Sequence, residues 1–298
     1  MMADVTRSPL APLTPTSAAL RLVWLRIRRN WPSAIALVLI VAMMLAAVLA
    51  NWIAPYEPDA TDAEAALRVP SLHHWLGTDI YGRDLLSRII FAARVDLTVA
   101  FGATALALAI GSTIGAVAGL YRGLVDLVIM RCVDSIMAFP AFILAMAITA
   151  ALGNSVTNVL IAISLTQIPN YLRLIRGEIF RIREMEYADA ARVVGNPAWR
   201  IIFIHLLPNC LPPIIVQATL AMGYALLTMA ALSFIGLGIQ PPQSEWGSMT
   251  AEGAQYIVTG EWWLFLFPGL AIVLMVLSFN LIGDSLRDFL DPRMRGVR

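Results

Sequence analysis

The side chains that could carry out covalent or acid–base chemistry are few in this 298-residue chain. It has three histidines, two cysteines and no lysine, and every one of its 21 basic residues is an arginine. A P-loop needs a lysine on the phosphates and a Schiff base needs a lysine amine, so the sequence excludes both. Neither Gly-x-Ser-x-Gly nor His-Glu-x-x-His occurs. We therefore expect no catalytic residue, and any ATP that drives this protein must be bound by another chain.

The histidines and cysteines also make a poor metal site. His73 and His74 are adjacent, so they would point apart on a helix, and no carboxylate or cysteine lies at ligand spacing. Cys132 and Cys210 are far apart in the expected topology, which predicts free thiols packed among apolar residues. The sequence therefore predicts no metal and no cofactor on this chain.

The composition is that of an integral membrane protein, with 59% hydrophobic and 14% charged residues. We expect an all-α fold with a cytoplasmic tail at 1–31 and a transmembrane domain at 32–298. A segment of 22 residues covers about 33 Å as a helix, which is enough to cross a bilayer. The first span is read as an anchor rather than a signal peptide, although residues 48–50 resemble a cleavage site. The six predicted spans are 33–54, 97–120, 136–152, 156–172, 210–237 and 262–282.

One charged segment, residues 184–208, interrupts the apolar spans. It predicts a helix from Glu184 to Val194, a left-handed stop at Gly195, and a second helix that Asn196 caps and Pro208 ends. In this reading Asp189 lies near the end of the first helix. Polar structure of this size cannot lie in lipid, so the segment must protrude and present a surface.

The residues of that segment resemble the "EAA" loop of ABC-importer permeases. The match consists of Asp189-Ala190-Ala191, then Gly195, then Leu207-Pro208; Asp189 stands where the family has glutamate, and His205 where it has isoleucine. The resemblance implies a coupling helix that seats in a cleft of an ATPase subunit. The alternatives are a DNA-reading helix–turn–helix and a simple connector, of which the first is out of place between two membrane spans.

Four further segments resemble the dipeptide and oligopeptide branch of these permeases: Trp75–Asp79, Gly82–Arg88, Gly236–Met249 and Phe279–Pro292. The resemblance implies the type I importer permease fold in the inner (cytoplasmic) membrane. It also implies a homologous second permease, two subunits that bind ATP and Mg²⁺, and an external solute-binding protein, but no nucleic acid. The implied substrates are dipeptides or oligopeptides, with nickel complexes, glutathione and opines as alternatives. A secondary transporter is disfavoured because no Asp, Glu or His lies in the middle of a predicted span.

Small and uncharged polar residues within the spans suggest further roles. Gly111, Gly115 and Gly119 are four apart, which predicts a stripe where another helix can approach closely, within this chain or from a partner. Uncharged polar residues need a protein or water environment, which favours either pore lining or hydrogen bonds between helices. The candidates for pore lining are Thr166, Gln167, Asn170, Gln217, Thr219 and Tyr224.

The charges predict local ion pairs and an orientation. Asp84 and Arg88 are four apart and Arg131 and Asp134 three apart, so each pair could form within a helix. The alternative for the first pair is a solvated amphipathic helix that lies on the membrane. Pro140 predicts a kink. With both termini in the cytoplasm, 17 arginines lie inside and four outside. The loop 184–208 is therefore predicted to be cytoplasmic.

Overall fold

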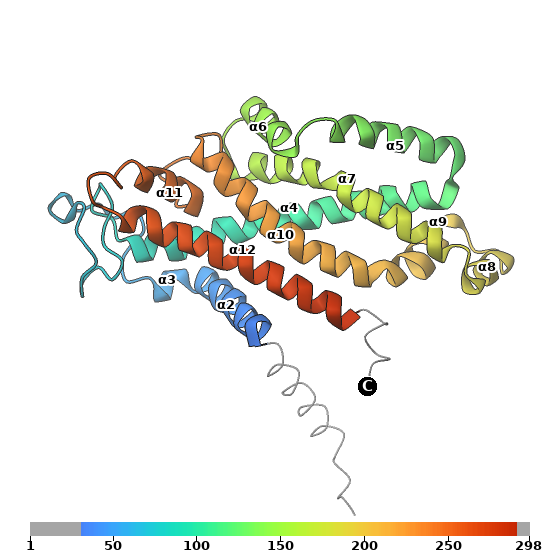
Figure 1. Cartoon of the computed structure of the whole chain (residues 1–298), viewed down its shortest axis with the longest axis horizontal. Coiled ribbons are helices and arrows are strands. Elements are labelled where there is room, and N and C mark those ends of the chain that lie inside the picture. Colours follow the sequence, from blue (N-terminus) through green and yellow to red (C-terminus); the bar gives the residue numbers. More distant parts are fainter. Residues whose placement is uncertain (1–30, 291–298) are drawn as a thin grey trace, which may run out of the picture.

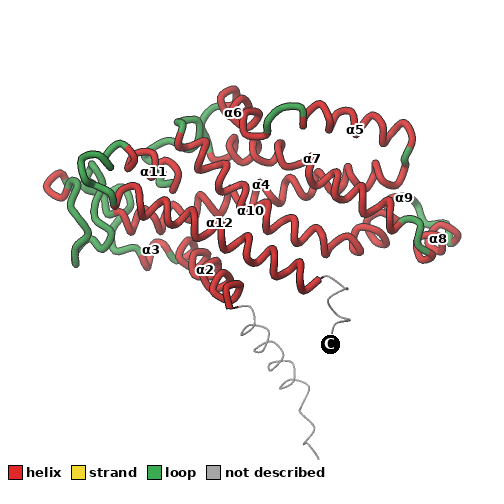
Figure 2. The backbone as a smooth tube through the Cα atoms, in the orientation of Figure 1, coloured by secondary structure: helices red, strands yellow, loops and turns green. Residues whose placement is uncertain are grey.

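The computed structural model describes residues 31–290. Within that range the chain is helical and forms no strand, and its long helices lie side by side along the molecule (Figures 1 and 2). The cytoplasmic tail predicted for 1–31 falls almost wholly outside the described residues, as do the arginines after position 290. The helices that build the body are α2 (Trp31–Val48), α4 (Leu85–Tyr121), α7 (Val156–Ile182), α10 (Leu211–Phe234) and α12 (Trp263–Leu290).

Four helical stretches among the described residues are long and apolar enough to cross a membrane. They are α2, α4, the continuous helical stretch Ala198–Phe234, and α12. A fifth is formed if α5 (Gly123–Met137) and α6 (Ala141–Leu152) count as one bent span. Helix α7 is long enough, but its polar residues make it less apolar than the four candidate spans. The structure thus supports a membrane protein with four to five candidate spans, and the predicted count of six is not confirmed.

Several helices extend beyond the predicted spans. The helix expected at 97–120 begins twelve residues earlier, at Leu85, because the charged residues at its start are buried rather than solvated. Asp96 therefore lies inside α4, directly before the predicted span, and is fully buried. The segment expected at 136–152 is broken by 85° between α5 and α6, and Pro140 directly precedes α6.

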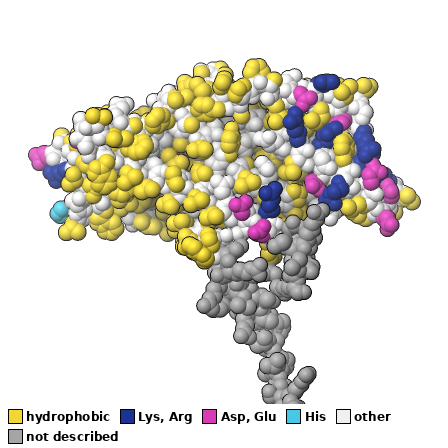
Figure 3. All heavy atoms as spheres, viewed as in Figure 1, with side chains coloured by type: hydrophobic (Ala, Val, Ile, Leu, Met, Phe, Trp, Pro, Cys, Tyr) yellow, Lys and Arg dark blue, Asp and Glu magenta, His cyan; other side chains and the backbone are white. Residues whose placement is uncertain are grey.

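Polar and apolar side chains are segregated along the molecule. Two ends can be distinguished: the α11 end comprises residues 54–84 and α11 (Trp246–Ala254), and the α8 end comprises the turn at Arg122 and residues 183–210. On the face seen in Figure 3, hydrophobic side chains cover the middle, while arginines and acids gather toward the α8 end. This arrangement is typical of a protein whose long axis crosses a bilayer.

The glycine stripe packs α4 against α7 of the same chain. A Cβ on Gly111 would lie 2.7 Å from the Cβ of Tyr171, and one on Gly115 only 2.5 Å from the backbone oxygen of Leu172. A Cβ on Gly119 would lie 2.7 Å from a methyl group of Ile179. The contact residues on α7 rise in number along with the glycines on α4, so the two helices run parallel. Helices α5 and α6 connect the end of α4 to the start of α7. The seam is therefore internal.

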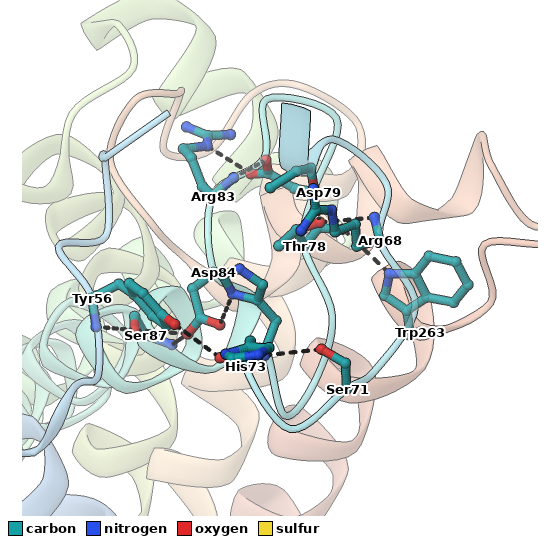
Figure 4. A network of polar contacts seen from close by, with 12 residues as sticks. Tyr56, Arg68, Ser71, His73, Thr78, Asp79, Arg83, Asp84, Ser87 and Trp263 are labelled. Carbon is teal, nitrogen blue, oxygen red and sulfur yellow. Dashed lines mark hydrogen bonds and ion pairs between the residues drawn. The ribbon is translucent and has the colours of Figure 1, made fainter. Parts of the chain in front are cut away.

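Buried ion pairs fold the segment that precedes α4 (Figure 4). One oxygen of Asp79 accepts hydrogen bonds from Arg83 Nε and Arg88 Nη1, both at 2.6 Å. Arg88 is only 2% exposed, and its Nη1 also lies 3.5 Å from a carboxylate oxygen of Glu252 on α11. The indole N–H of Trp263 donates to the backbone oxygen of Thr78 at 3.3 Å. Contacts of this kind join the segment to α4, α11 and α12.

The predicted ion pair between Asp84 and Arg88 is wrong. Asp84 is the N-cap of α4, where its carboxylate accepts from the backbone N–H and the hydroxyl of Ser87, both at 2.8 Å. Its other oxygen lies 3.0 Å from Nδ1 of His74, whose ring packs on Tyr56. The first N–H groups of a helix lack partners inside it, so a carboxylate at this position serves the backbone. A helix lying on the membrane is also excluded, because Arg88 is buried.

The predicted pair of Arg131 with Asp134 is also wrong. Asp134 accepts from Arg173 Nη2 of α7 at 2.6 Å, and Asp126 accepts from Arg176 Nη2 at 2.6 Å. Helix α5 lies alongside α7, which brings these guanidinium groups to both of its acids. Because Val133 is the one buried residue of α5, the two ion pairs are its main polar attachment to α7.

Candidate coupling surface

The charged segment 184–208 forms the tip of the α8 end (Figure 1). Its first helix, α8 (Glu186–Val193), begins after Met185, which is extended. Ala188 is fully buried in one apolar cluster with Ile182 and Ile201, so the segment is folded back on its own chain rather than hanging free. The predicted first helix is therefore present at the tip, although it is shorter than 184–194, and the predicted second short helix is not formed as a separate element.

A Schellman motif ends α8. Gly195 has φ of +83°, as the predicted left-handed stop requires. Its N–H donates to the Arg192 oxygen at 2.9 Å, and the N–H of Asn196 donates to the Ala191 oxygen at 3.3 Å. Most side chains adopt this φ only at a cost, while glycine adopts it freely. A Cβ at Gly195 would meet nothing within 4 Å, so the requirement for glycine is one of backbone conformation and not of space.

The second helix differs from the expectation. Asn196 does not cap it; its side-chain amide donates instead to the Ala191 oxygen at 2.9 Å, and Pro197 is the N-cap residue. Pro208 does not end it either. After α9 (Ala198–Arg200) the backbone passes through a π-helical segment and a 3₁₀ turn into α10. Pro208 is the second residue of that turn, near its start, where a missing N–H is tolerated.

The residues matched to the loop motif are placed differently with respect to solvent. Ala191 is buried and Leu207 is partly buried against the apolar cluster. Asp189 lies in the first turn of α8, not near its end, and accepts from Arg192 Nη1 at 2.6 Å. That position suits the positive end of the helix dipole, which corrects the expectation that it is poorly placed. Of the motif residues, Asp189, Ala190, Gly195 and Pro208 are exposed.

An exposed apolar patch next to Gly195 was missed by the sequence reasoning. Val193 is 87% exposed, Val194 is 80% exposed and Trp199 is 55% exposed. Met185, Tyr187, Phe203 and Ile204 of the same segment are exposed as well. Large apolar side chains that face solvent are unfavourable in water and favourable in a contact with another protein. Two adjacent valines directly before the glycine stop were the signal available in the sequence.

The tip is fastened to the ends of α4 and α7. Arg183 donates to the backbone oxygens of Gly119 and Leu120, which are free acceptors at the end of α4, at 3.2 and 2.8 Å. Arg122 Nη2 donates to Glu184 at 2.8 Å. The hydrogen bond from Arg183, together with the charge of Arg122, holds the pKa of Glu184 below its ordinary value. These contacts join the start of the tip to the end of α4, and the tip follows α7 directly in the chain.

The candidate pore residues do not share one environment. Thr166 and Gln167 are buried between helices; the Thr166 hydroxyl donates to the Ile163 oxygen at 2.8 Å and the Gln167 amide to the Ala221 oxygen at 3.4 Å. These two make hydrogen bonds inside the chain. Two of the remaining candidates, Asn170 and Tyr224, are exposed, while Gln217 and Thr219 are partly buried.

Comparison with known proteins assigns the family. Residues 111–296 match the binding-protein-dependent transport system inner membrane component family, and residues 19–70 match the N-terminal TM domain of oligopeptide transport permease C. The dipeptide transport system permease protein DppC of Alkalihalophilus pseudofirmus is 44% identical over 270 residues, which cover 91% of this chain and 88% of that protein.

Two relatives from Escherichia coli K12 agree with this. DppC, a dipeptide transport system permease protein, is 42% identical over 304 residues, covering 99% of this chain and all of that protein. The probable D,D-dipeptide transport system permease protein DdpC is 42% identical over 276 residues, covering 93% and 92%. These matches cover 99% and 93% of the chain. The chain therefore belongs to the family of inner membrane components of binding-protein-dependent transport systems, in its oligopeptide permease branch.

Proposed function

We propose that this chain is one permease subunit of an ATP-driven importer for dipeptides or oligopeptides. The named relatives are peptide transport permeases, and they match over nearly the whole chain. The observation that carries the proposal is the tip at 184–208, which exposes apolar side chains and whose start is hydrogen-bonded to the end of α4. ATP and Mg²⁺ would be held by two separate subunits, consistent with a chain that has no lysine for a P-loop.

The tip would work as a mechanical coupling. We expect Val193, Val194 and Trp199 to supply apolar surface for a cleft in an ATP-binding subunit. Asp189 and Ala190 lie on α8 with Val193. When ATP draws two such subunits together, each cleft would carry a tip inward. Arg183 and Arg122 would pass that movement to α4 and α7, so that the helices open the pore toward the other side of the membrane.

Two substitutions test this coupling. Gly195→Val places a β-branched residue at φ +83° and should distort the Schellman motif, while Asp189→Arg reverses the charge and removes the bond to Arg192. Both should abolish ATP-driven uptake in vesicles and reduce ATPase stimulation. Gly195→Asn is the matched control for backbone conformation, because asparagine tolerates the left-handed region, and should retain most activity. Wild-type stimulation in both Gly195→Val and Asp189→Arg would reduce the tip to a connector.

A second, homologous permease would complete the pore. The exposed candidates Asn170 and Tyr224, with Gln217 and Thr219, are the polar side chains that we propose line it, whereas Thr166 and Gln167 hold α7 in place. The α8 end would face the cytoplasm with both termini, and the α11 end would face the solute-binding protein. The concentration of arginines at the α8 end supports this orientation.

The substrate class is tested by uptake. Vesicles with the complete transporter should accumulate labelled dipeptide in the presence of ATP and its binding protein, and unlabelled nickel complexes, glutathione or opines should not compete. No uptake of labelled dipeptide, together with ATP-dependent uptake of one of these compounds when it carries the label, would assign the transporter to that alternative. Because the coupling variants fail with any substrate, the two tests are independent.

A further inference from the structure

Two acidic side chains are buried together where α4, α10 and α11 meet. Asp96 on α4 and Glu245 directly before α11 are both fully buried, and Asp96 accepts a hydrogen bond from the backbone N–H of Trp246, the residue that follows Glu245. Trp246, also fully buried, packs beside them and donates its indole N–H to the Ile89 oxygen at 3.0 Å. Two negative charges in such an environment would be strongly unfavourable.

The two carboxyl groups differ in their hydrogen-bond donors. Glu245 is the N-cap of α11, and its two oxygens accept from the backbone N–H groups of Gly247 and Ser248, both at 2.7 Å. Asp96 accepts one longer bond on Oδ2, from the N–H of Trp246 at 3.3 Å. Within the described part of the chain its Oδ1 has no partner. Glu245 therefore has the hydrogen-bond donors that stabilise an ionised carboxylate, and Asp96 lacks them.

Among residues 31–290, no basic side chain forms an ion pair with Asp96 or Glu245. Arg88, earlier on α4, is engaged by Asp79 and Glu252. Arg94 donates to backbone oxygens at the end of α2. Helix α10 carries Tyr224 as its only ionisable residue, and Glu252 is the only one within α11. Burial raises the pKa of Glu245.

We propose that Asp96 and Glu245 form a proton-binding site that retains one proton at neutral pH. Asp96 carries the proton, and its O–H donates to the Glu245 carboxylate, which the two backbone N–H groups stabilise as an anion. The bond fastens α11 to α4. Two carboxyl groups this close titrate as a unit, so the site holds one proton in the folded chain at a pH where the unfolded chain holds none.

The direction of the pH dependence follows from this excess proton. A folded state that binds more protons than the unfolded state loses stability as pH rises. The unfolding equilibrium constant should increase about tenfold per pH unit above the ordinary carboxyl pKa of about 4, until the shared proton is released. The wild-type melting temperature should therefore fall between weakly acidic and weakly alkaline pH.

Infrared spectroscopy observes the proton directly. In the full-length chain in nanodiscs at pH 7 we expect the C=O stretching band of a protonated carboxylic acid, which ¹³C-labelled aspartate shifts and ¹³C-labelled glutamate does not. Labelling needs no substitution, so the test does not depend on the folding of a variant. Absence of the band at pH 7, or a shift by labelled glutamate alone, would overturn the proposal.

Substitutions test the assignment by a second route. Asp96→Asn imitates the protonated side chain, so it should keep the melting temperature near that of wild type at pH 7 and remove the pH dependence of this site. Glu245→Gln loses an anionic cap and should melt lower. Asp284→Asn, at an exposed position on α12, is the control and should leave the wild-type pH dependence unchanged. The reverse ranking of Asp96→Asn and Glu245→Gln, or a wild-type pH slope in Asp96→Asn, would contradict the shared proton on Asp96.

Discussion

Replacing Gly115 by alanine tests how closely α4 and α7 pack. The new Cβ would lie 2.5 Å from the oxygen and 3.1 Å from the Cα of Leu172. Both are backbone atoms of a long helix, so no side-chain rotation can relieve the clash. The two helices must separate along the seam that Gly111 and Gly119 also form.

The expected cost is the difference between two effects. Alanine in place of glycine favours a helix by about 0.5–1 kcal/mol, whereas overpacking of a tight contact costs about 1–3 kcal/mol. The difference is a net loss centred on about 1 kcal/mol, which lowers the melting temperature of a domain of this size by about 2–4 °C. Gly115→Leu should be worse, because a larger side chain cannot be placed between the two backbones.

The assay is thermal unfolding of the purified full-length chain, with Gly177→Ala as the matched control. Gly177 lies on α7, and a Cβ there would meet nothing within 4 Å. The control therefore has the gain in helix propensity without the clash, and its melting temperature should equal or exceed that of wild type. If Gly115→Ala behaves like Gly177→Ala, the close approach of α4 and α7 at this position is refuted.

Three further predictions concern the ends of the molecule. Asp79→Asn leaves two buried guanidinium groups poorly paired and should cost about 3–5 kcal/mol, whereas Asp134→Asn at an exposed pair should cost below about 1 kcal/mol; equal melting temperatures would contradict this. Asp84→Ala removes the cap of α4 and should cost about 1–2 kcal/mol in the same assay. In a background without native cysteines, Gln243→Cys should react with a membrane-impermeant thiol reagent in intact cells, and Asn196→Cys only after permeabilisation; labelling of Asn196→Cys in intact cells would reverse the orientation.

Local features of the chain were predictable because their causes are local. The left-handed stop at Gly195 and the break at Pro140 follow from single residues with strong backbone preferences, and both are present. The apolar spans follow from composition. The length of α4 could not be predicted from composition, since its first turns are charged and a charged stretch usually indicates a solvated loop. Here those charges are paired and buried.

The sequence could not predict which charged side chains pair with one another. Arg88 was matched with Asp84 by helical spacing, yet its partners are Asp79 and Glu252, the second of which follows by 164 residues. Spacing along a helix ranks the neighbours within that helix and says nothing about a carboxylate that a distant element brings closer. The same holds for Asp96, whose burial depends on α11. Contacts between distant elements also fixed the environments of the pore candidates.

The central claim is that the tip at the α8 end docks on an ATP-binding subunit. The most direct test is site-specific cross-linking from Val194→Cys, an 80% exposed position, in an assembled transporter without native cysteines. A photoreactive group on this cysteine should cross-link to an ATP-binding subunit, and the yield should change between ATP and ADP, while the same group on Gln243→Cys should give no such product. A transporter that remains active in uptake but gives no cross-link from Val194→Cys to an ATP-binding subunit would contradict the claim.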